Sequence, residues 1–101
     1  MSTAATPYLS RMTDTVRDNP SRNRFELQTG AGMAIANYRR DDRTIAITHT
    51  EVPRAVEGRG VGSALVKGML DEIRREGRKV VPLCSFVRAY INRHPEYHDL
   101  V

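Results

Sequence analysis

Glu57-Gly58-Arg59-Gly60-Val61-Gly62 stands where the hydrophobic period of the chain changes. Before this stretch, apolar residues alternate with polar ones, which is the period of a half-buried strand. After it, apolar residues recur every three or four positions, which is the period of a helix with one buried face. Three spaced glycines between a strand and a helix predict a tight turn whose backbone can approach a ligand closely.

Three strands are predicted before the glycine loop. They cover residues 24–29, 33–38 and 44–52, and the last of them is rich in β-branched residues. Gly30-Ala31-Gly32 and Asp41-Asp42 supply the turns, and such short connections predict antiparallel hairpins.

The sequence after the loop predicts a helix, a strand and a second helix. Val61, Leu65, Met69 and Ile73 lie on one helical face, and Gly77 is expected to end that helix. Residues 79–84 form a short apolar strand, expected to run parallel to 44–52 because it follows a helix. Pro82 favours an edge position or a bulge for that strand. Ser85 is expected to cap the final helix, which stops before Pro95.

The predicted fold class is therefore α+β, an antiparallel meander leading into a β-α-β-α unit, in the order β-β-β-α-β-α. The domain is expected over residues 23–101. Residues 1–22 are polar and are expected to form a partly ordered N-terminal segment. A short helix with Tyr8, Leu9, Met12 and Val16 on one side is predicted there, ending at Pro20.

Composition sets limits on the class of protein. The 101 residues support one domain, and the net charge of +4 favours anionic partners or simply an arginine-rich surface. A single cysteine, Cys84, excludes a disulfide within the chain. The chain has no apolar run of membrane-spanning length and no signal-peptide pattern at Met1-Ser2-Thr3, so a cytoplasmic protein without a membrane partner is expected. A monomer or a homodimer through an edge strand is expected.

The glycine loop has the chemistry of an anion site. Backbone N–H groups of the loop and of the first helical turn suit a pyrophosphate, and Arg59 and Ser63 add a charge and a hydroxyl donor. A tight turn with only a structural role is the alternative. A Rossmann loop needs G-x-G-x-x-G, whereas the spacing here is G-x-G-x-G. A P-loop needs G-K-[ST], which is absent from this segment.

The segment resembles motif A of the Gcn5-related (GNAT) acetyltransferases, Q/R-x-x-G-x-G/A. Gly60 and Gly62 match the two family glycines, while Glu57 stands where the family has Gln or Arg. The chain is also similar, over about residues 24–101, to the small YjdJ-type N-acetyltransferase subgroup. That resemblance rests on the glycine loop and on 49–53 (HTEVP), 81–87 (VPLCSFV) and 93–97 (RHPEY).

The resemblance implies an enzyme that uses acetyl-CoA as cosubstrate and an amine of unidentified nature as acceptor. It places the pantetheine arm of coenzyme A (CoA) along Thr50, Glu51 and Val52. It places the pyrophosphate at the loop and helix start. The expected CoA-binding residues are Thr50, Val52, Gly58, Arg59, Gly60, Val61, Gly62 and Ser63.

Four residues are candidates for the chemistry. His49 or Glu51 could act as general base, and both share one face of a regular strand. The resemblance suggests Tyr90 as the acid that protonates the CoA sulfur, although a packed aromatic is the alternative. Cys84 precedes a helix, a setting that lowers a thiol pKa. It could therefore accept acetyl before the amine, or it could be a small buried apolar residue. Direct transfer is the expected main route.

Two other function classes compete with the enzyme. A non-catalytic module that binds CoA or acetyl-CoA would need the glycine loop but no catalytic residues. A small basic nucleic-acid binder is disfavoured, because the six aromatic residues are not interleaved with basic ones. His94 and His98 have helical metal-ligand spacing, but Pro95 lies between them, so no metal site is predicted.

Overall fold

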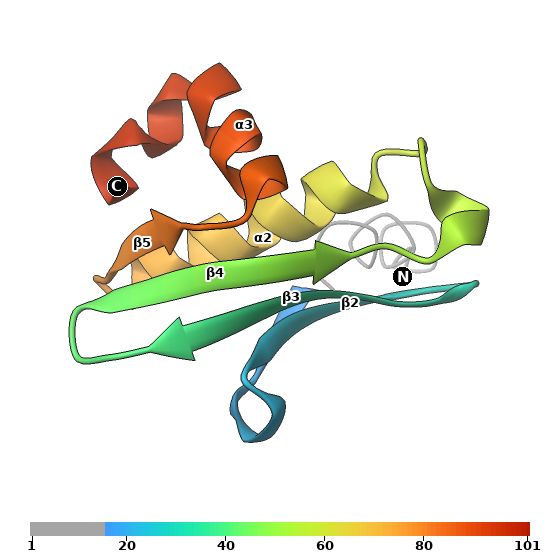
Figure 1. Ribbon diagram of the computed structural model, residues 1–101, viewed down its shortest axis with the longest axis horizontal. Coiled ribbons are helices and arrows are strands. Elements are labelled where there is room, and N and C mark those ends of the chain that lie inside the picture. Colours follow the sequence, from blue (N-terminus) through green and yellow to red (C-terminus); the bar gives the residue numbers. More distant parts are fainter. Residues whose placement is uncertain (1–15) are drawn as a thin grey trace, which may run out of the picture.

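A single twisted sheet with strand order β1-β2-β3-β4-β5 is the framework of the computed structural model, which describes residues 16–101 (Figure 1). The first four strands are antiparallel neighbours, and β5 runs parallel to β4. The strands are β1 Val16–Asn19, β2 Arg24–Thr29, β3 Gly32–Arg40, β4 Thr44–Glu51 and β5 Lys79–Pro82. The helices are α2 Val61–Arg75 and α3 Ser85–Arg93, with 3-10 turns η1 Pro20–Arg22, η2 Arg54–Val56 and η3 Pro95–Leu100.

The α+β class and the meander leading into a parallel crossover are confirmed. Pro82 is the last residue of edge strand β5, where its missing N–H costs no ladder hydrogen bond. Gly77 follows the last residues of α2 with φ +73°. Its N–H bonds the Arg74 carbonyl, and the Arg78 N–H bonds that of Ile73, which together form a Schellman motif.

Two details of the sequence prediction were wrong. Val16 belongs to strand β1, which the pattern did not predict, and not to a helix; Tyr8, Leu9 and Met12 lie outside the described residues. The β1 strand exists because Val16 pairs with Leu27 and packs on α2, where a Cβ at Gly68 would lie 2.5 Å from Val16 Cγ2. Cys84, and not Ser85, is the N-cap residue of α3, and Ser85 is the first helical residue.

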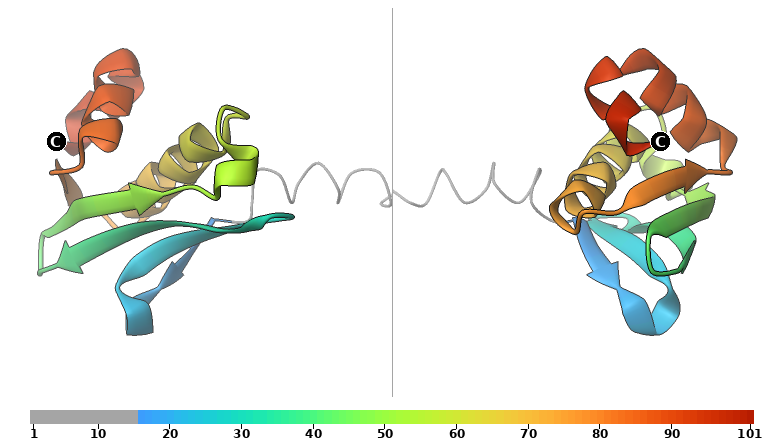
Figure 2. Two further views of the ribbon diagram at one scale, coloured as in Figure 1. Left: turned by 45° about the vertical axis from the view of Figure 1, so that its right-hand side comes forward. Right: turned by 90° about the vertical axis from the view of Figure 1, so that its left-hand side faces the viewer.

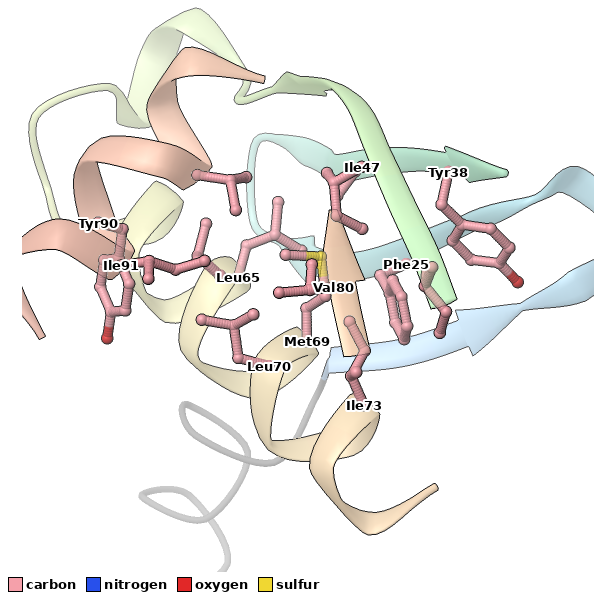
Figure 3. Packing of buried hydrophobic residues seen from close by; sticks show 14 of the residues in the cluster. Phe25, Tyr38, Ile47, Leu65, Met69, Leu70, Ile73, Val80, Tyr90 and Ile91 are labelled. Atoms are coloured by element: carbon pink, nitrogen blue, oxygen red, sulfur yellow. The ribbon is translucent and has the colours of Figure 1, made fainter. Parts of the chain in front are cut away.

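Both helices cover the same face of the sheet (Figures 1 and 2). The buried side chains of every strand from β2 to β5 point to that face and meet those of α2 and α3. Figure 3 shows Phe25, Ile47 and Val80 from the sheet beside Leu65, Met69 and Ile73 of α2. No helix within residues 16–101 covers the other face, which we call the open face. Nor does this part of the chain contain a helix long and apolar enough to cross a membrane.

A bulge at Thr48 divides strand β4 into two halves. On β3, neighbouring residues Asn37 and Tyr38 pair with His49 and Ile47, so Thr48 has no partner. Thr48 Oγ1 donates instead to the Asn37 carbonyl, 3.3 Å away. Before the bulge, Ile47 faces the core. After it, Thr50 pairs with buried Ala36 and faces the helices.

The same bulge turns His49 and Glu51 to the open face. Their partners on β3 are Asn37 and Ile35, which alternate with the buried residues of that strand. One surplus residue therefore determines which side chains of β4 face the helices and which face away from them.

Candidate active site

Strands β4 and β5 separate at the end of their paired region. Their last pair is Ile47 with Pro82, and the Cys84 N–H donates to the Ile47 carbonyl at 3.0 Å. Beyond this point β4 continues to Glu51, while the chain after β5 turns into α3 (Figure 1). Within residues 16–101, no strand pairs with the edge of β4 from Thr48 onward that faces away from β3.

The glycine loop begins just past this free end of β4. Gly58 and Gly60 have φ of +81° and +82°, a left-handed conformation that other L-residues adopt at a cost. Gly60 is the N-cap residue of α2, and its carbonyl accepts the first helical bond from Ala64 at 3.0 Å. Since glycine has no side chain, Gly60 itself does not cap the N–H groups of the first turn.

These N–H groups form a set of free donors. Five backbone N–H groups of the loop and helix start have no hydrogen-bond acceptor among residues 16–101. They belong to Gly58, Gly60, Val61, Gly62 and Ser63. The positive end of the α2 dipole lies at the same place. This is the arrangement that binds phosphate groups at helix N-termini.

A pocket of about 430 Å³ opens at this end of the sheet. The structure brings five of the predicted CoA-binding residues to it, whereas Thr50, Arg59 and Val61 do not line it. Two residues not predicted to bind CoA, Glu57 and Phe86, complete the wall. The lining residues are Val52, Glu57, Gly58, Gly60, Gly62, Ser63 and Phe86. A second hollow of about 460 Å³, over the turn of residues 41–44 at the other end of β4, contains no predicted site residue.

Phe86 is the functional candidate that sequence reasoning missed. It lies in the first turn of α3, and its ring lies against Gly62 of α2. A Cβ at Gly62 would be 2.8 Å from Phe86 Cζ and 3.6 Å from Val52 Cγ2. Gly62 therefore allows an aromatic ring, and not only a ligand, to approach the helix. One signal was available in the sequence. Phe86 directly precedes the buried Val87, and only one of two consecutive helical residues can face the core, so the other apolar side chain must lie elsewhere.

Thr50 and Cys84 meet across the gap between β4 and α3. Thr50 Oγ1 and Cys84 Sγ lie 3.6 Å apart in a partly buried contact. Burial raises the pKa of the Cys84 thiol, but N–H groups of Val87 and Phe86 and the Thr50 hydroxyl together lower that pKa below its ordinary value. The thiol makes no full capping hydrogen bond to α3, so these N–H groups act as nearby dipoles.

His49 and Glu51 form a pair on the open face. His49 Nε2 lies 2.9 Å from Glu51 Oε2, and both side chains are more than half exposed, at 55% and 63%. The structure thus brings these two candidates together. It separates them from Cys84, the N-cap residue of α3, which contacts Thr50 on the side of β4 that faces the helices. Such a carboxylate–imidazole pair fixes the imidazole orientation.

Tyr90 is not brought to the pocket. It is buried on α3, its ring stacks on His94 with centroids 3.9 Å apart, and Tyr97 packs beside it. Burial raises the pKa of its hydroxyl, and the nearest charges are Lys67, Glu96 and Asp71. Figure 3 shows the hydroxyl directed away from Ile47 and β4.

The two C-terminal histidines bond to backbone carbonyls of α3. His94 Nδ1 lies 2.7 Å from the Tyr90 carbonyl, and His98 Nε2 lies 3.0 Å from that of Ile91. In the part of the chain that the structure describes, no three His, Cys, Asp or Glu side chains gather as metal ligands would.

Comparison with known proteins adds independent evidence. A family model described as GCN5-related N-acetyl-transferase matches residues 24–100. Protein NATD1 of Homo sapiens is 36% identical over 53 residues, which are 52% of this chain and 47% of that protein. Protein NATD1 of Danio rerio is 33% identical over 61 residues, 58% of this chain and 56% of that protein. The chain therefore spans about half the length of these curated relatives.

A solved structure matches nearly the whole fold. It is the NMR solution structure of a protein from Staphylococcus aureus described as a GCN5-like N-acetyltransferase. The two chains superpose with a TM-score of 0.65 at 27% sequence identity. The match covers 86% of this chain and 88% of the other.

Proposed function

Because the chain belongs to the GCN5-related N-acetyltransferase family, we propose that it transfers an acetyl group from acetyl-CoA to an amine. The observation that supports this most is the set of free N–H donors at the start of α2, which opens into the pocket beside the unpaired edge of β4. Members of this family generally use acetyl-CoA, and the donor set suits the pyrophosphate of that molecule.

The coenzyme would lie along the groove between β4 and α3. The proposed pyrophosphate site is the loop and first turn of α2, from Gly58 to Ser63, with Arg59 as a mobile countercharge. The proposed path of the pantetheine arm follows Val52 and Thr50, where β4 has lost its strand partner. Glu57 departs from the family pattern and lies in the wall of this pocket, where its carboxylate opposes an anion.

The acceptor would approach from the open face, where His49 and Glu51 lie. We propose His49 as the group that takes the proton from the ammonium form of the acceptor, with Glu51 orienting it. The amine lone pair then attacks the thioester carbonyl. A C–N bond forms, the nitrogen loses its second proton as the C–S bond breaks, and CoA leaves as a thiolate that accepts one proton.

Tyr90 and Cys84 are the two remaining catalytic candidates. Tyr90 stays the proposed donor to the leaving thiolate on the family resemblance alone, since it does not line the pocket. The Cys84 thiol contacts the hydroxyl of Thr50, which lies on the proposed path of the pantetheine arm. An acetyl-Cys84 intermediate is the secondary route, and direct attack is the primary one. Assignment to the YjdJ-type subgroup also stays a prediction.

A non-catalytic module that binds CoA is the second candidate function. The observation that favours it is the separation of the candidate groups, with Tyr90 outside the pocket and His49 more than half exposed. Such a module would bind acetyl-CoA and CoA with similar affinity and would not release free thiol.

Two measurements on the full chain test these functions. Calorimetric titration with acetyl-CoA, using NAD and ATP as controls, is expected to show selective binding of acetyl-CoA. Release of free CoA thiol in the presence of a panel of amines and peptides then distinguishes the enzyme from the module. Absence of binding to both acetyl-CoA and CoA would rule out both functions and leave the glycine loop a structural turn.

A further inference from the structure

Phe86 is an aromatic residue that the fold leaves 41% exposed at the wall of the pocket. The next residue, Val87, is fully buried and already supplies the core contact of the first turn of α3. Hydrophobic packing of the helix therefore does not require the ring of Phe86. A ligand in the pocket can cover this exposed ring, and removing its apolar surface from water favours binding.

Two contacts fix the position of the Phe86 ring, one between the start of α3 and strand β4 and the other with Gly62 of α2. The Cys84 N–H donates to Ile47 of β4, and its carbonyl accepts the Arg88 N–H, each at 3.0 Å, which anchors the start of α3 to the sheet. The ring edge then occupies the space beside Gly62 that any larger residue would fill. Among the lining residues, only Val52 supplies a second apolar side chain.

The pocket consequently has two chemically different walls. Free N–H groups of the glycine loop and α2 form one wall, and the Phe86 ring with Val52 forms the other. A bare diphosphate would satisfy only the first wall. A ligand that joins a diphosphate to a partly apolar arm would satisfy both.

We propose that Phe86 is a specificity-determining residue, which holds the pantetheine arm against Val52 and so makes the site prefer coenzyme A over nucleotides that have the diphosphate alone. This inference rests on the proposed function, because it assumes that CoA enters this pocket. It adds a residue and a selectivity that the glycine loop by itself does not provide.

The test compares two ligands in matched variants of the full chain. CoA affinity is measured by calorimetry, and ADP, which has the diphosphate without the arm, is measured by displacement of CoA. In Phe86→Ala the CoA dissociation constant is expected to rise roughly tenfold, the change expected when about 55 Å² of apolar contact is lost. The ADP constant is expected to stay within about twofold. Phe86→Leu should give an intermediate value.

Two further variants control for altered folding and for general loss of apolar surface. Leu83→Ala removes an apolar residue that is 51% exposed in the same segment but does not line the pocket, and it should leave both constants unchanged. Gly62→Ala keeps the Phe86 ring but adds a Cβ where the ring edge now lies, so the ring must move. This variant should also weaken the binding of CoA more than that of ADP.

Three results would overturn the inference. An equal loss for CoA and ADP would make Phe86 a structural wall of the pocket. Unchanged CoA affinity in Phe86→Ala would remove it from the site, while leaving the proposed function intact. Failure of the unaltered protein to bind CoA would refute the proposed function and this inference together.

Discussion

Thr50 and Cys84 are 34 residues apart in the chain, yet their hydroxyl and thiol lie 3.6 Å apart where β4 and the start of α3 face each other. Thr50 reaches this position because the bulge at Thr48 turns it to the helix side of the sheet. The contact links the end of β4 to the Cys84 thiol, whose pKa lies below its ordinary value.

Replacement of Thr50 by valine should raise the pKa of Cys84, because it removes a hydrogen bond that stabilises the thiolate and keeps the shape of the side chain. The thiolate fraction at pH 7 should fall about threefold, the effect of one modest hydrogen bond. The pH dependence of alkylation by iodoacetamide, followed by intact mass, measures this. Thr48→Val is the matched control, since the Thr48 hydroxyl bonds the Asn37 carbonyl. Superimposable profiles for Thr50→Val and the unaltered protein would refute the effect.

Cys84→Ala distinguishes the two routes of transfer. If the amine attacks the thioester directly, the variant should keep turnover within about tenfold of the unaltered enzyme, because only a packing contact is lost. The mass of the protein after incubation with acetyl-CoA, without acceptor, provides the second readout. A stable acetyl adduct in the unaltered chain, together with a turnover loss of roughly a thousandfold or more in the variant, would establish the cysteine route instead.

Gly60→Glu and Gly60→Gln separate backbone strain from charge at the N-terminus of α2. In both variants the new residue must adopt the left-handed backbone conformation of Gly60, so the free energy of unfolding of each should fall by about 1–2 kcal/mol. Neither Cβ meets another atom within 4 Å, so the loop can remain in place. Only the glutamate adds a negative charge next to the free donors, and it should weaken CoA binding several-fold beyond the glutamine. Equal affinities in calorimetry would show that no anion binds there.

Asp71 predicts a pH-dependent part of the stability. Burial raises its pKa, but hydrogen bonds from the Tyr97 hydroxyl at 2.7 Å and from Lys67 at 3.0 Å lower the pKa below its ordinary value overall. A folded-state pKa below the unfolded one stabilises the protein above the unfolded value, and this stabilisation is lost as the pH falls through the folded value.

Asp71→Asn should therefore cost about 0.5–1 kcal/mol at pH 7, a figure reduced for the partial exposure of the pair with Lys67. The difference from the unaltered protein should shrink as the pH falls below about 4, where the carboxylate is protonated first in the unfolded state and then, at lower pH, in the folded state. Urea unfolding at pH 7 and pH 3 gives both values. Asp42→Asn, in the exposed hairpin turn, should show no such convergence.

The hydrophobic periods predicted the elements that contain a regular pattern. Leu65, Met69 and Ile73 identified the buried face of α2, and the change of period at the glycine loop predicted the parallel pairing of β4 and β5. Strand β1 was missed because its four residues, VRDN, contain only one apolar side chain, and its pairing depends on distant Leu27 and Gly68.

The candidate site was predictable only where local sequence determines it. The loop glycines and their free N–H groups follow from a strand–turn–helix pattern. The position of Phe86 depends on how α3 approaches Gly62, and that of Tyr90 on its packing with His94 and Tyr97. His49 and Glu51 were expected to share a face, and they do, but nothing in their spacing could show which face it is.

The unpaired Thr48 makes strand β4 tolerant of change at position 48, both in composition and in length. Many residues could replace a threonine whose side chain is exposed and bonded to one carbonyl. Deletion of that residue would leave the phase of the strand unchanged, because Ile47 and His49 already pair with consecutive residues of β3. His49 and Glu51 would still face the open face, and Thr50 would still face the helices. A substitution scan should therefore find position 48 permissive, and a scan of single-residue deletions should find it among the most tolerant positions of the sheet.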